Sequence, residues 1–82
     1  MGSERRLMLL GKREELKGRQ EQLFEDTKTQ RKAISNACFI SDDPMEIDAD
    51  NILANAKTLA HKVEEYREMD KKIKEIKEEL GG

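Results

Sequence analysis

The sequence predicts an all-α protein: an antiparallel two-helix coiled-coil hairpin, forming one domain over residues 1–82 and completed as a four-helix bundle by dimerisation. Charged residues make up 41% of the chain and aromatic residues 4%, which is typical of charged helical proteins. Apolar residues recur at spacings of three and four in both halves, as they do on one face of a helix. The only proline lies between the halves, among turn-forming residues, and this favours a bend.

The first helix is predicted over residues 4–37, with a mixed apolar face. One line of residues at seven-residue intervals is mostly apolar and comprises Leu9, Leu16, Leu23, Gln30 and Ala37. The alternate line is mostly polar and comprises Arg13, Gln20, Thr27 and Ile34. Leu10, Phe24 and Cys38 follow the first line one step round the helix and widen the apolar face. Polar residues at such positions typically specify register and partner while lowering stability, which favours an assembly protein.

The bend is predicted over residues 38–47, within the most acidic part of the chain. Residues 38–50 hold five acidic side chains and no basic one, although the whole chain has a net charge of only −2. Two residues are suitable N-caps for the following helix. Asp43 before Pro44 suits an N-cap with proline at the first helical position. Asp48 is an equally suitable N-cap for a helix that begins later.

The second helix is predicted over residues 48–80, and its apolar face is the clearer one. Its apolar residues are Ile52, Ala56, Leu59, Val63, Tyr66, Met69, Ile73, Ile76 and Leu80. Their spacing alternates regularly to Val63 and slips by three residues near Tyr66, which predicts a locally overwound coiled coil. Gly81 stands where a helix is commonly stopped by a residue with positive φ.

Two helices of similar length with a short connection fold back antiparallel. Because two helices share one interface, part of their apolar surface stays exposed in a single hairpin, and this predicts a dimer. The residues expected to line the oligomer seam are Leu9, Leu16, Leu23, Phe24, Ile52, Leu59, Val63, Tyr66, Ile73, Ile76 and Leu80.

No arrangement of residues predicts catalysis, a cofactor or a metal site. His61 is the only histidine and lies off the apolar face, so we expect it on the surface. One cysteine, Cys38, cannot form an internal disulfide, which favours a cytoplasmic protein. The longest apolar run, residues 7–10, is far short of a membrane span. We therefore expect neither an enzyme nor a membrane protein.

Two functions remain. The preferred one is a non-enzymatic scaffold, adaptor or small chaperone-like subunit that binds itself or another helical protein. In it, the large apolar side chains of the bend, namely Phe39, Ile40, Met45 and Ile47, form a partner-binding surface because they are ringed by charge, as binding hot spots are. The alternative is a nucleic-acid-binding hairpin dimer that uses basic residues of the first helix, which are Arg5, Arg6, Lys12, Arg13, Lys17, Arg19, Lys28, Arg31 and Lys32. Interleaved acids and the overall charge disfavour it.

Overall fold

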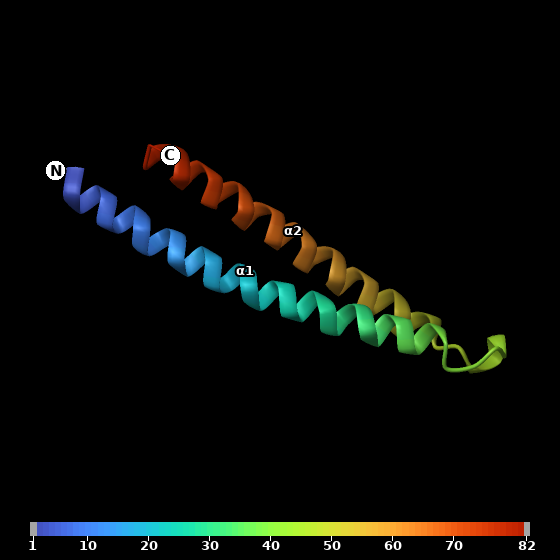
Figure 1. Cartoon of the computed structure of the whole chain (residues 1–82). Coiled ribbons are helices and arrows are strands. Elements are labelled where there is room, and N and C mark those ends of the chain that lie inside the picture. The colour runs from blue at the N-terminus through green and yellow to red at the C-terminus, as the bar shows by residue number, and fades with distance from the viewer. Residues whose placement is uncertain (1, 82) are drawn as a thin grey trace.

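A computed structural model describes residues 2–81 as a long helical hairpin. It contains α1 (Gly2–Cys38), a short 3-10 helix η1 (Pro44–Glu46) and α2 (Ala49–Glu79). The two long helices run antiparallel, so that the beginning of α1 lies beside the end of α2 and the bend lies at the far end (Figure 1). The molecule measures 65 × 16 × 14 Å. The predicted all-α two-helix hairpin is therefore confirmed.

Both of the acidic caps considered for the second helix are used, each for a different element. The Asp43 carboxylate accepts a hydrogen bond from the Met45 backbone N–H at 3.0 Å and caps η1. The Asp48 carboxylate accepts one from the Asn51 backbone N–H at 3.0 Å and caps α2. Between them Ile47 is extended, with φ −82° and ψ 121°, so the helix cannot continue through it. The main helix consequently begins after Asp48.

The C-terminal stop at Gly81 is also confirmed. Gly81 has a φ of 86°, in the left-handed region that favours glycine. Its backbone N–H donates to the Glu78 carbonyl oxygen at 3.0 Å, as in a Schellman-type helix end. Leu80 is the C-cap.

The register of α2 differs from the sequence-based interpretation. The half-buried and buried positions that face α1 follow an unbroken alternation of three and four residues: Ile52, Asn55, Leu59, Lys62, Tyr66, Met69, Ile73, Ile76 and Leu80. We call this line, with its counterpart on α1, the seam. Ala56 is exposed, so the assignment of Ala56 to the face that packs on α1 was wrong. The predicted slip near Tyr66 is absent because Lys62, and not Val63, takes the seam position before Tyr66.

A polar contact explains the difference. The Gln30 side-chain amide donates a hydrogen bond to the Asn55 side-chain carbonyl across the two helices, so Asn55 rather than Ala56 takes the seam position. Lys62 lies in the seam ahead of Val63, which is half-buried just beside it. Assigning the face from apolar residues alone shifted the pattern by one residue at both places.

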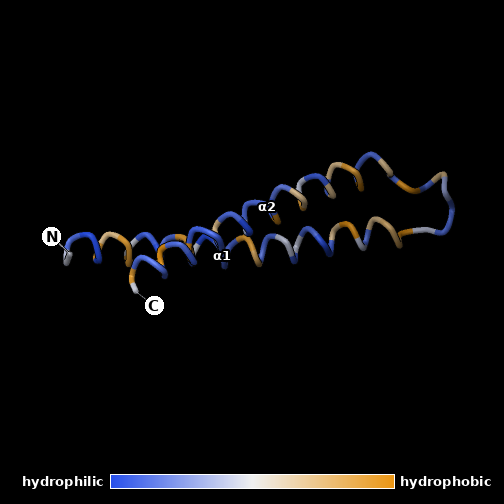
Figure 2. Tube along the Cα trace, turned by 90° about the horizontal axis from the view of Figure 1, so that it is seen from above, coloured by the Kyte–Doolittle hydropathy of each residue, from blue (hydrophilic) through white to orange (hydrophobic). Residues whose placement is uncertain are grey.

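The core of a single hairpin is small. Among residues 2–81 only Leu16, Leu23 and Ile76 are buried, and Leu23 alone is fully so, with 0% of its surface exposed. The apolar residues are scattered along both helices between polar ones (Figure 2). Polar groups interrupt the seam, and the Arg13 Nε is buried without a hydrogen-bond partner among the described residues. One hairpin therefore buries few apolar side chains for its length.

Candidate interaction surface

The two sides of the hairpin, on either edge of the seam, have different chemistry. On one side, three ion pairs connect α1 to α2. Arg5 pairs with Glu79 at 2.6 Å, Arg19 with Glu65 at 3.1 Å, and Asp26 with Lys62 at 3.9 Å. The α1 partners are separated by multiples of seven residues, and each lies just outside the seam. We call this side the closed flank, because charged side chains bridge the helices along it.

The opposite side is called the open flank. Its innermost residues directly follow every second seam residue along each helix. On α1 it comprises Leu10, Lys17, Phe24, Arg31 and Cys38. On α2 it comprises Ala56, Val63, Asp70 and Lys77, with Leu53 and Ala60 one position further out. None of the ion pairs between α1 and α2 in residues 2–81 lies on this flank. Its apolar members stay accessible: Phe24 is 50% and Leu53 55% exposed.

Grooves between the helices follow the open flank. Near its middle, one is lined by Phe24, Thr27, Val63, Tyr66 and Arg67. Phe24 and Tyr66 also line the neighbouring groove, which continues toward the chain ends beside Gln20. The Phe24 ring thus lies at the centre of this side, with the Lys28 ammonium nitrogen 4.8 Å from its centroid, a cation–π arrangement.

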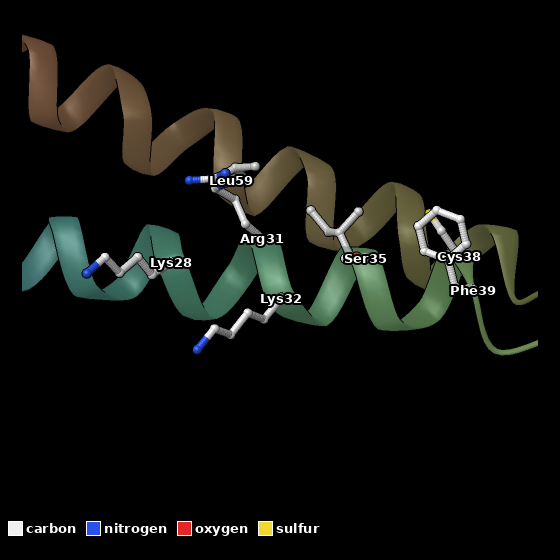
Figure 3. A pocket seen from close by; sticks show the side chains of 8 residues that line it. Lys28, Arg31, Lys32, Ser35, Cys38, Phe39 and Leu59 are labelled. Carbon is white, nitrogen blue, oxygen red and sulfur yellow. The ribbon is translucent and has the colours of Figure 1, made fainter.

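A groove of about 810 Å³ lies between Phe24 and the bend. Its lining combines apolar and basic side chains: Lys28, Arg31, Lys32, Ile34, Ser35, Cys38, Phe39 and Leu59. Arg31 extends from α1 toward Leu59 of α2, whereas Lys32 points away from α2 (Figure 3). The groove therefore has an apolar floor with cationic groups along one edge.

The predicted partner-binding residues of the bend are mostly accessible. Phe39 is 85% and Met45 91% exposed, Ile40 is exposed as well, and only Ile47 is half-buried. Phe39 contributes to the basic groove, which joins the bend to the open flank. The exposed methionine lies in η1, next to the Asp43 cap.

A polar cluster marks the open flank toward the chain ends. The Asp70 carboxylate accepts hydrogen bonds from the Lys74 ammonium at 2.9 Å and from the Gln20 amide at 3.4 Å. These two donors, Lys74 first, lower the pKa of Asp70, and the same Asp70 contact raises the pKa of Lys74. Asp70 is therefore held as an anion that faces the open flank.

The single histidine and the single cysteine are both accessible. His61 is exposed, as is Cys38 at the edge of the basic groove. Within residues 2–81 no three His, Cys, Asp or Glu side chains are grouped as metal ligands would be. No helix in that range has the length and apolar character to cross a bilayer.

The basic residues of α1 do not form one surface. Arg5 and Arg19 are engaged in ion pairs on the closed flank, and Arg13 lies half-buried in the seam. Lys28, Arg31 and Lys32 are the ones that the fold gathers, around the basic groove. The positions of these basic residues around α1 alone do not predict which of them form ion pairs and which line the groove.

No protein-family model, curated protein or solved structure matches this chain.

Proposed function

We propose that this protein is a non-enzymatic assembly module that associates with itself through the open flank, forming a four-helix bundle. The asymmetry of the two flanks is the observation that carries the proposal. Ion pairs connect the helices on the closed flank, whereas Phe24 and Leu53 remain half-exposed beside grooves on the other. Burying such side chains against a second copy would stabilise the assembly by about 25 cal/mol for each Å² of apolar surface removed from water.

The small core supports the same proposal. With three buried apolar side chains in the described chain, a single hairpin has little to offset the conformational entropy lost on folding. A second hairpin packed on the open flank would cover Phe24, Val63, Tyr66 and Leu53 and turn half-buried positions into core. The bend would remain outside this bundle core, where Phe39, Ile40 and Met45 could serve as a second contact surface for a helical partner protein.

The test is a matched pair of substitutions. Phe24→Glu places a carboxylate at the centre of the open flank, and we expect it to weaken self-association at least tenfold, because the charge would have to be buried on assembly. Ala33→Glu introduces the same side chain at an exposed position on the closed flank and should leave the molar mass unchanged. Sedimentation velocity over a range of concentrations measures both. Equal association of the two variants would contradict the proposal.

A second candidate function follows from the basic groove, where Lys28, Arg31 and Lys32 gather. These cations could contact the phosphates of a nucleic acid. This function predicts binding of a labelled oligonucleotide that weakens steeply between roughly 50 and 200 mM salt, because phosphate contacts release counterions. Lys32→Glu would then reduce binding, with Lys57→Glu on α2 as the control. Absence of binding at the lower salt concentration would remove this candidate.

A further inference from the structure

We propose that the second copy packs with its bend at the same end as the first, so that α1 of each copy lies against α2 of the other. This inference rests on the proposed self-association and adds its orientation. The two-fold axis then runs along the length of the hairpin. Such an axis keeps each residue at its own height along the bundle, so the pairs between copies can be deduced from the register within one hairpin.

That register is fixed by contacts between the helices. On the open flank, Phe24 and Val63 line one groove, and the Gln20 side-chain amide donates a hydrogen bond to the Asp70 carboxylate at 3.4 Å. Counting along both helices from Phe24 and Val63 puts Lys17 level with Asp70. It also puts Lys28 within one residue of the height of Ala60, and Glu21 within one residue of that of Arg67. The ion pairs Arg5–Glu79 and Arg19–Glu65 of the closed flank join residues three positions out of this register, a difference that their long side chains span.

Charges on the open flank are complementary in this orientation. Going from Phe24 toward the chain ends, the open flank and the positions just outside it present Glu21, Lys17 and Glu14 on α1. At the same heights α2 presents Arg67, Asp70 and Lys74. Every acid meets a base and every base an acid. Within one hairpin, Glu14, Lys17 and Glu21 make no ion pair with α2 among the described residues. Among the described residues, Arg67 and Lys74 pair only with Glu64 and Asp70 on their own helix, and ion pairs of this kind at the surface are weak enough to exchange.

Apolar residues match from Phe24 toward the bend. Phe24 lies level with Val63, and Lys28 and Arg31 lie level with the small residues Ala60 and Ala56. Small side chains there leave room for the aliphatic parts of the basic ones, whose charged groups can remain in water. Leu53, half-exposed in the single hairpin, would reach the apolar floor of the partner's basic groove.

The opposite orientation, with the bends at opposite ends and α1 against the partner's α1 around Phe24, is less favourable. It places Lys17 of one copy opposite Arg31 of the other, since both are seven residues from Phe24. It also places the partner's Asp70, whose pKa is lowered by its contacts with Lys74 and Gln20, opposite the apolar Ala56, since both are seven residues from Val63. Like charges and a buried carboxylate both disfavour association.

Crosslinking between two differently substituted chains tests the orientation. Both chains carry Cys38→Ser, so that each has one thiol. A chain with Lys28→Cys is mixed with a chain with Ala60→Cys, treated with a short bismaleimide and analysed by mass spectrometry. We expect a covalent heterodimer in which position 28 is joined to position 60. A matched mixture of Lys28→Cys with Glu21→Cys reports the opposite orientation, because those positions would then be adjacent.

The outcomes separate the orientation from the association itself. Crosslinking of 28 to 60 well above that of 28 to 21 supports the inference. Preferential crosslinking of 28 to 21 overturns it and leaves the proposed self-association standing. Equal, weak crosslinking in both mixtures while the molar mass is that of a dimer also overturns it. A monomeric mass for the unmodified protein would remove the proposed function and this inference together.

Discussion

Replacing Leu23 with Asp is expected to abolish the cooperative unfolding transition of the protein. Leu23 is the one fully buried side chain in the described chain and lies near the middle of α1. Truncating a buried leucine lowers the free energy of unfolding by about 2–5 kcal/mol, and an unpaired buried carboxylate adds a desolvation penalty. Small domains are stable by only about 5 kcal/mol or a little more, so most of the molecules would be unfolded.

Thermal melting followed by circular dichroism measures this effect. The control is His61→Asp, which introduces the same carboxylate at an exposed position near the middle of α2. It should change stability by less than about 1 kcal/mol, which reflects helix propensity alone. A normal melting transition for Leu23→Asp would mean that Leu23 does not face the seam, and the register of α1 would be wrong.

The double substitution Gln30→Leu with Asn55→Leu is expected to raise the free energy of unfolding by about 1–3 kcal/mol. These two side chains are half-buried and hydrogen-bonded to each other across the seam. Replacing both partners of such a bond by apolar groups removes the desolvation of two amides and adds apolar burial. Denaturant titration gives the magnitude, through a shift of the midpoint at a similar slope.

Either single substitution distinguishes this explanation from a general gain in hydrophobicity. Gln30→Leu alone leaves the Asn55 amide without its partner on α1, so we expect it to be neutral or destabilising. The double variant should also be less specific in its association, because polar seam residues commonly fix register. If Gln30→Leu alone were as stabilising as the double variant, the hydrogen bond between the helices would have no role.

Much of the hairpin could be predicted from the sequence, because the signals involved are local. The bend follows from Pro44 and its acidic neighbours, and Gly81 marks the end of α2 through its freedom to adopt a positive φ. The sequence did not show whether Asp43 or Asp48 caps the main second helix, since each is a suitable N-cap residue. The extended backbone at Ile47, which separates their two helices, depends on how the chain crosses the bend.

The register of α2 was harder to predict, because polarity and burial disagree at two positions. Asn55 and Lys62 occupy seam positions that a search for apolar residues assigns to Ala56 and Val63. Only the partner helix explains the choice, since Gln30 bonds to Asn55 and Asp26 pairs with Lys62. A strict three-and-four spacing from Leu59 in both directions would have found these residues.

The difference between the two flanks could not be predicted from either helix alone. It depends on which acid lies within reach of which base, as Glu65 does of Arg19, and that requires the register of both helices at once. Phe24 was expected in the oligomer seam, and the structure places it at the centre of the open flank. Its role in assembly stays a prediction.

The molar mass of the unmodified protein in solution tests the central claim most directly. One chain has a mass of 9.5 kDa. Light scattering coupled to size-exclusion chromatography, at micromolar concentrations, should give twice this value, about 19 kDa (2 × 9.5), and the melting temperature should rise with protein concentration. A mass of 9.5 kDa with a melting temperature independent of concentration would contradict self-association through the open flank.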